Sequence, residues 1–192
     1  MTRVVVIDPQ PAVRAGLALM LRAEPGLVPV GSAVGASDGM KLVDRQRPDV
    51  VVLDPHLLDG DGLGTCRRLR TLDPAPRVVL YSAGGDPGLP LSARVAGADG
   101  LVDKAAPAEE LFEAIRLVAR GASALPPLDR RQLDAAAHRV EPEDLALLAM
   151  LVDRTSPADV AATLRLHPRK LARRIERLLG RLRTRPARSL PA

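Results

Sequence analysis

The chain has 192 residues, enough for a medium domain of about 120 residues and a small one of about 50. Hydrophobic residues make up 46% of it but aromatic residues only 1%, so the core must be aliphatic and base stacking on aromatic rings is not expected. Cys66 is the single cysteine, which leaves no disulfide framework and fits a reducing cytoplasm. The first apolar run, Val4 to Ile7, is too short for a signal peptide or a membrane span, so we expect a cytoplasmic protein without a membrane partner.

The net charge of +5 is distributed unevenly along the chain. Residues 1–120 carry 14 basic and 15 acidic side chains, whereas residues 121–192 carry 14 basic and 8 acidic ones. From Arg165 to Arg188 there are ten Arg or Lys residues and one acid, Glu176. A solvated helix face usually mixes both signs, so this asymmetry predicts a C-terminal segment that binds a polyanion.

Short β-branched runs alternate with helical segments over the first 120 residues. The alternation predicts a parallel α/β sheet, and the unbroken hydrophobicity of the runs indicates strands that are buried on both faces. We expect strands at 4–7, 28–30, 50–53, 78–81 and 100–102, with helices near 11–22, 37–46, 62–70, 91–96 and 107–119.

Residues 121–127, Gly-Ala-Ser-Ala-Leu-Pro-Pro, end this alternation, because two prolines cannot continue a helix interior. Beyond them the pattern predicts three helices, each beginning with proline at its first position: 142–152, 157–164 and 168–183. We therefore divide the chain into an α/β domain at 1–120, a linker at 121–139, a small all-α domain at 140–185 and a tail at 186–192.

Polar side chains follow four of the expected strands, namely Asp8, Asp54, Ser82 and Lys104. The carboxyl ends of parallel strands meet at one edge of a doubly wound sheet, so these groups should converge. Two carboxylates are suited to a hard cation such as Mg²⁺, while a hydroxyl and an ammonium group are suited to phosphoryl oxygens.

Three other kinds of site are not expected. The first strand is followed by Asp8-Pro9-Gln10-Pro11 instead of the glycine-rich turn of a dinucleotide site. His56 and His138 lack the companion Cys or His spacing of a zinc site. Cys66 has no obvious base near it in sequence and is interpreted as a small core residue.

Four motifs in order resemble those of receiver domains. Residues 51–62, Val-Val-Leu-Asp-Pro-His-Leu-Leu-Asp-Gly-Asp-Gly, resemble the phosphoacceptor loop, including the glycine eight residues after the acceptor. Ser82-Ala83 and residues 97–104 match later motifs of the family, and residues 8–14 resemble the opening loop of the NarL/FixJ subgroup. The resemblance covers essentially the whole chain and implies a flavodoxin-like, doubly wound, five-stranded parallel receiver domain followed by a small all-α helix-turn-helix domain.

The resemblance also implies roles for the polar residues. Asp54 would be the nucleophile that takes a phosphoryl group from a sensor histidine kinase. Asp8, Asp54 and the backbone carbonyl of His56 would bind Mg²⁺, and Ser82 and Lys104 would contact the phosphoryl group.

The chain departs from the family at three places. Pro9 stands where a second acid is usual, which implies weak Mg²⁺ binding. Leu101 stands where many receivers carry Tyr or Phe, and Pro87, Gly88 and Pro90 erode the start of the fourth helix. These departures leave open a second hypothesis, an atypical pseudo-receiver transcription factor that works independently of phosphorylation.

The last expected helix has an apolar stripe and a basic face. The stripe consists of Leu171, Ile175, Leu178 and Leu182, and the basic side chains are Arg169, Lys170, Arg173, Arg174 and Arg177. A helix of this kind suits the major groove of DNA. Residues 140–185 resemble the LuxR-type helix-turn-helix, although Thr155, Lys170 and Leu171 depart from its usual pattern, so the base preference does not transfer.

Together these features predict a DNA-binding transcriptional response regulator of a two-component system, which binds double-stranded DNA as a homodimer and is not a turnover enzyme. The region of the fourth and fifth helices would alter dimerisation or domain contacts. A third hypothesis is an interaction adaptor whose basic helix contacts proteins. Duplex affinity that falls steeply with salt would separate the first two hypotheses from the third.

Overall fold

The computed structural model describes residues 1–182, which form two compact units. The first unit contains residues 1–84 and 96–126, and the described part of the second contains residues 85–95 and 127–182.

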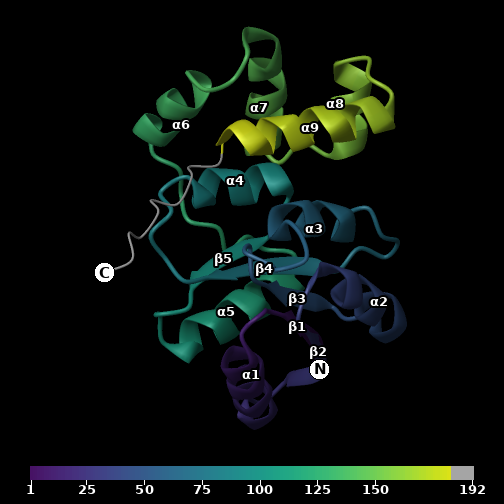
Figure 1. Cartoon of the computed structure of the whole chain (residues 1–192), viewed down its shortest axis with the longest axis vertical. Helices are drawn as coiled ribbons and strands as arrows, with labels where there is room; N and C mark the ends of the chain where they lie inside the picture. The colour runs from purple at the N-terminus through teal and green to yellow at the C-terminus, as the bar shows by residue number, and fades with distance from the viewer. Residues whose placement is uncertain (183–192) are drawn as a thin grey trace. The chain divides into compact units, whose positions relative to one another are not determined.

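The first unit is built on a five-stranded parallel sheet with the strand order β2-β1-β3-β4-β5 (Figure 1). The strands are β1 (Thr2–Ile7), β2 (Leu27–Ala33), β3 (Val50–Leu53), β4 (Arg77–Ser82) and β5 (Gly100–Asp103). This order and the flanking helices confirm the predicted flavodoxin-like receiver fold. Every residue of β3 is buried, as expected for a strand covered on both faces.

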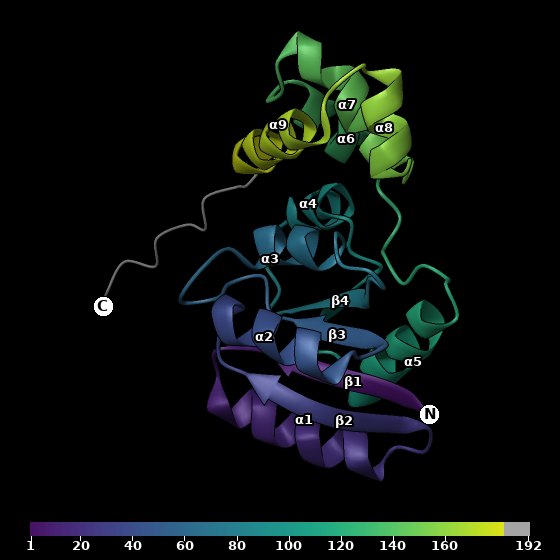
Figure 2. The same ribbon diagram turned by 90° about the vertical axis from the view of Figure 1, so that its right-hand side faces the viewer.

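Helices cover both faces of the sheet (Figure 2). They are α1 (Pro11–Ala23), α2 (Ala36–Gln46), α3 (Gly62–Leu69) and α5 (Ala108–Ala119). On the face covered by α1 and α5, Val4 and Val6 pack in one core with Leu21 and Ile115. On the opposite face, α2 approaches β1 so closely that a Cβ on Gly39 would lie 2.6 Å from the side chain of Ile7.

Strand β2 is longer than the expected 28–30, and the start of the fourth helix and the expected linker also differ from the sequence prediction. Helix α4 (Leu89–Ala96) begins two residues earlier than expected, because Pro90 lies in the first turn, where no backbone donor is needed. Ala124, in the expected linker, forms a parallel bridge with Gly100 of β5, and a Cβ on Gly100 would lie 3.1 Å from that of Ala124. The start of the linker therefore lies along the edge of the sheet.

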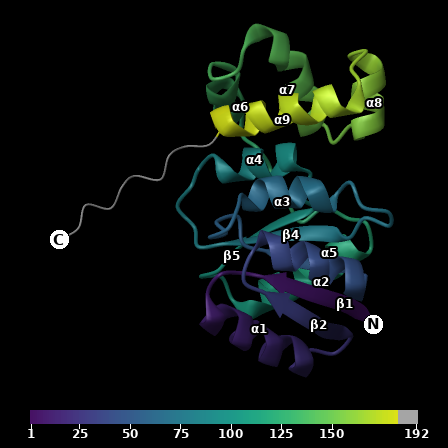
Figure 3. The ribbon, with the colours of Figure 1, turned by 45° about the vertical axis from the view of Figure 1, so that its right-hand side comes forward.

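The rest of the second unit is helical over the described residues (Figure 3). It contains α6 (Arg130–Ala137), the 3₁₀ turn η1 (Pro142–Asp144), α7 (Leu145–Val152), α8 (Pro157–Thr163) and α9 (Pro168–Leu182). Helix α6 lies inside the expected linker and was not predicted. Its sequence signal is a capping box, in which Asp129 and Gln132 satisfy each other's backbone N–H groups.

The three predicted C-terminal helices are present, with the first beginning as a 3₁₀ turn. Leu147, Leu151, Val160 and Ile175 are among the residues that form their buried core. The predicted end of the last helix at Arg183 and of the small domain at residue 185, and the tail at 186–192, lie outside the described residues.

Candidate functional site

Lys104 lies between two buried carboxylates at the carboxyl edge of the sheet. Its Nζ is 2.6 Å from Asp8 Oδ2 and 2.5 Å from Asp54 Oδ2. Asp8 is 1% exposed, Asp54 is 5% exposed and the Lys104 side chain is 10% exposed. Burial lowers the pKa of Lys104, but the hydrogen bonds to Asp54 and Asp8 outweigh that effect and leave its pKa raised. Three of the four polar side chains predicted to converge therefore meet, with Lys104 as a charged bridge between Asp8 and Asp54.

Both carboxylates are oriented by their own loops. Asp54 Oδ1 accepts the backbone N–H of His56 at 2.6 Å, and Asp8 Oδ1 accepts that of Gln10 at 2.8 Å. The second oxygen of each group is thus directed at Lys104. The site is ordered by backbone donors as well as by charge.

Ser82 and Lys104 are neighbours across β4 and β5. Ser82 is buried at the end of β4, and its carbonyl accepts the backbone N–H of Lys104 at 2.7 Å. The Lys104 ammonium also lies over the Tyr81 ring, 5.9 Å from its centroid. His56 is exposed, and it contacts the site through its backbone N–H, which donates to Asp54 Oδ1.

The loop between Asp54 and α3 packs tightly. A Cβ on Gly62 would lie 2.4 Å from the carbonyl oxygen of Asp54, so only glycine fits where α3 begins. Asp61 caps α3 by accepting the N–H of Leu63 at 3.0 Å. The glycine was singled out from the sequence, but the capping role of Asp61 was not, although an Asp before a helical pattern is a recognisable signal.

Arg14 of α1 is a second residue that was not predicted. Its guanidinium donates to the carbonyl oxygens of Asp8 and Pro9, at 2.8 and 3.0 Å. Proline has no carboxylate to offer the site, and the backbone oxygen of Pro9 accepts a hydrogen bond from Arg14.

Helix α9 presents cations on one side and leucines on the other. Leu171, Ile175, Leu178 and Leu182 are buried, which confirms the apolar stripe. The side chains of Arg169, Lys170, Arg173 and Arg177 are exposed. Arg174 is different: its side chain is 17% exposed, and it contacts the buried carboxylate of Asp144 and the carbonyl of Glu143. Four of the five predicted side chains therefore face outward, and Arg174 holds α9 against η1.

A family model for the response regulator receiver domain matches residues 4–116. The chain is a response regulator. The DNA-binding transcriptional activator DevR/DosR of Mycobacterium tuberculosis is 32% identical to this regulator over 95% of this chain and 88% of its own length.

Two solved structures resemble the regulator in fold and sequence. A LuxR-family two-component response regulator from Aurantimonas sp. SI85-9A1 has a TM-score of 0.62 at 32% identity, covering 73% of this chain and 99% of the other. The signal receiver domain of a NarL response regulator from Mycobacterium tuberculosis has a TM-score of 0.59 at 30% identity, covering 62% and 97%. The predicted resemblance to the NarL and LuxR type of response regulator is confirmed.

The receiver's acidic edge fits a hard cation. Residues 1–182 contain no group of three or more His, Cys, Asp or Glu side chains arranged to hold a metal. Mg²⁺, however, typically uses one or two carboxylates and retains several waters. Asp8 and Asp54 supply two such carboxylates, each with one oxygen fixed by a backbone N–H.

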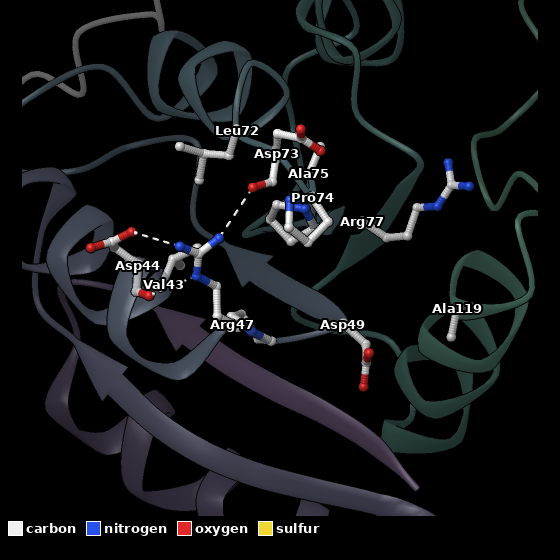
Figure 4. A pocket seen from close by; sticks show the side chains of 12 residues that line it. Val43, Asp44, Arg47, Asp49, Leu72, Asp73, Pro74, Ala75, Arg77 and Ala119 are labelled. Carbon is white, nitrogen blue, oxygen red and sulfur yellow. Dashed lines mark hydrogen bonds and ion pairs between the residues drawn. The ribbon is translucent and has the colours of Figure 1, made fainter.

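A pocket of about 340 Å³ lies at the opposite, amino end of β3 and β4 in the regulator (Figure 4). Arg47 extends into it, donating to the carbonyl oxygens of Asp44 and Asp73 at 3.1 Å each and pairing with the Asp44 carboxylate at 3.6 Å. Arg77, on its wall, pairs with buried Asp99 at 3.1 Å. Because both guanidinium groups have protein partners, we assign the pocket no ligand.

Across residues 1–182 of the regulator, no helix is long and apolar enough to cross a membrane.

Proposed function

We propose that this response regulator is a transcription factor of a two-component system, in which phosphorylation of Asp54 in a receiver domain (1–120) controls DNA binding by a helix-turn-helix domain (140–185). The observation that carries the proposal is the placement of Lys104 between Asp8 and Asp54 at the carboxyl edge of the sheet. A nucleophilic carboxylate beside a fixed cation is the arrangement that phosphoryl transfer requires.

In the proposed reaction, a carboxylate oxygen of Asp54 attacks phosphorus. A bond between that oxygen and phosphorus forms as the bond between phosphorus and the donor, a histidine of a sensor kinase or a small phosphodonor, breaks. Lys104 neutralises charge on the phosphoryl oxygens, and the Ser82 hydroxyl donates a hydrogen bond to one of them. The product is an acyl phosphate, so Asp54 is a reversible acceptor and the protein is not a turnover enzyme.

Asp8, Asp54 and the His56 carbonyl would hold Mg²⁺, which when bound supplies further neutralisation of the phosphoryl charge. Two features favour weak binding. Pro9 brings no carboxylate, and the Lys104 ammonium already pairs with one oxygen of each acid. A metal must therefore compete with a cation that the protein itself provides.

The proposed DNA-binding surface consists of the exposed cations on α9: Arg169, Lys170, Arg173 and Arg177. Arg174 is left out because it pairs with Asp144 inside the helical unit. We propose that a homodimer places two such helices on two half-sites of double-stranded DNA, which also implies a cytoplasmic location.

Intact mass spectrometry tests the phosphorylation step. The full chain is incubated with acetyl phosphate and Mg²⁺, and compared with Asp54→Asn and with Asp38→Asn, which changes an exposed carboxylate on α2. We expect one phosphoryl adduct on the wild type and on Asp38→Asn, and none on Asp54→Asn. No adduct on a folded wild type, beside a control receiver that reacts, would refute phosphorylation control.

A second candidate function is a phosphate-independent pseudo-receiver. The observation that favours it is that the protein's own cations already contact the site, since Lys104 bridges both acids and Arg14 binds the carbonyl of Pro9. An unreactive Asp54 combined with DNA binding would support this function. A duplex affinity that does not fall with salt would instead support the hypothesis of an interaction adaptor whose basic helix contacts proteins.

A further inference from the structure

The turn between α8 and α9 contains an arginine in a backbone conformation that favours glycine. Arg165 has a φ of 51°. Its N–H bonds the carbonyl of Ala162 at 3.2 Å, and the N–H of Leu166 bonds that of Ala161 at 2.9 Å. These two bonds form a Schellman motif, in which the left-handed position is usually glycine because a Cβ there is strained.

In the receiver, Arg47 has the same left-handed backbone conformation, and side-chain hydrogen bonds accompany it. Arg47 has a φ of 45°, but its side chain bonds the carbonyls of Asp44 and Asp73. The Arg165 side chain is exposed, and within residues 1–182 it forms no hydrogen bond or ion pair. No contact inside the described part of the chain compensates for arginine at this position.

Charge adds a second unfavourable feature around Arg165. From Val160 to Ile175 the sequence contains five basic residues and no acidic one. Arg174 is neutralised by Asp144, while the other four are exposed around the first turns of α9: Arg165, Arg169, Lys170 and Arg173. Like charges gathered at the positive end of a helix repel one another in the free protein. A bound polyanion turns this repulsion into attraction.

We propose that Arg165 contacts the phosphate backbone of double-stranded DNA, beside the groove-facing side chains of α9; this inference rests on the DNA binding proposed above. A long, flexible side chain on a turn outside the helix is suited to a phosphate, not to a base edge. Its contribution is therefore independent of sequence, and it depends on salt through the release of counterions.

The test uses the full chain and a fluorescently labelled duplex of mixed sequence long enough for two half-sites. Affinity is measured by anisotropy over a series of KCl concentrations, and Tm is measured for each protein. Arg165→Gly removes strain and charge, Arg165→Gln removes charge alone, and Arg165→Lys keeps the charge.

Stability and DNA binding should move in opposite directions in Arg165→Gly. We expect its Tm to rise by about 2–4 °C, because glycine suits the left-handed backbone. Its duplex affinity should fall about fivefold near physiological salt, and the slope of log K against log [KCl] should become shallower by about 0.9, the value for one phosphate contact. Arg165→Gln should lose the same affinity without the gain in Tm, and Arg165→Lys should keep the wild-type slope.

The possible failures are distinguishable. If the wild type binds the duplex without salt dependence, or does not bind it, the proposed DNA binding is wrong and the role of Arg165 fails with it. If the wild type binds normally and both Arg165→Gly and Arg165→Gln keep its affinity and slope, only the role of Arg165 is refuted. A fall in the Tm of Arg165→Gly would overturn the strain argument.

Discussion

The carboxylate of Asp59 occupies the space in which a side chain on Gly35 would lie. A Cβ on Gly35 would fall 2.2 Å from Asp59 Oδ1. Gly35 is the N-cap residue of α2 and has no side chain to cap it, so Asp59 accepts the N–H groups of Ala36 and Ser37 instead, at 2.7 and 3.1 Å. The loop that follows Asp54 is thereby attached to the start of α2.

Gly35 and Asp59 should show non-additive effects on stability. Asp59→Ala should lower the denaturation midpoint because two N–H groups of α2 lose their acceptor. Gly35→Ala should also lower it, by forcing Asp59 out of position. In the double variant the second change should add little, because the methyl group introduced at position 35 no longer meets a carboxylate. Urea denaturation of the four proteins measures this coupling, and simple additivity would contradict it.

The same contact predicts a dependence of stability on pH. Hydrogen bonds from the backbone N–H groups of Ser37 and Ala36 lower the pKa of Asp59 below its ordinary value of 3.8. A lowered pKa contributes stability that is present above the ordinary value and is lost as pH falls through the folded value. We therefore expect the wild type to have a larger free energy of unfolding than Asp59→Asn above about pH 3.8, and this difference to shrink as the pH falls below that value. Asp38→Asn, on the exposed part of α2, is the control.

Lys104 should stabilise the receiver against repulsion between its two acids. Lys104→Met leaves Asp8 and Asp54 buried without a cation, so we expect the free energy of unfolding to fall by about 2 kcal/mol at neutral pH. Adding Asp8→Asn should restore part of that loss. The raised pKa of Lys104 means that its contribution persists up to about pH 10.5 and is lost as pH rises through the folded value. An unchanged stability of Lys104→Met would contradict the ion-pair geometry.

Arg173 and Arg174 are adjacent in sequence but should behave as different kinds of residue. Arg174→Ala leaves the buried Asp144 carboxylate without its partner, so the free energy of unfolding of the helical unit should fall by about 2–3 kcal/mol. Arg173→Ala changes an exposed side chain, so it should alter stability by less than about 0.5 kcal/mol while weakening duplex binding. Denaturation and anisotropy on both variants measure the contrast, and equal destabilisation by the two would refute it.

The Cys66 thiol should be inert in the folded protein. It is fully buried, and burial raises its pKa to about 12, while its Sγ lies 3.6 Å from the carbonyl of Ala96. Because the thiolate is the reactive form, a thiol-reactive aromatic disulfide at pH 8 should label the chain only after denaturant is added. Rapid labelling under native conditions would show that α3 opens more readily than the structure indicates.

The sheet could be predicted from the sequence because buried parallel strands are continuous apolar runs, which are local patterns. Val50 to Leu53 was predicted to the residue. The convergence of Asp8, Asp54 and Lys104 also followed, since parallel strands bring their carboxyl ends to one edge. The apolar stripe of α9 followed from helical periodicity.

Contacts between distant segments were decided only by the tertiary structure. The pattern of α9 does not distinguish Arg173 from Arg174, because the difference depends on Asp144, 30 residues away. Likewise, the sequence pattern does not show that Asp59 caps a helix that begins 23 residues earlier, or that Arg14 binds the carbonyl of Pro9. Periodicity records which side of an element is apolar, whereas the partner of a charged group is set by which elements pack together and how closely their backbones approach.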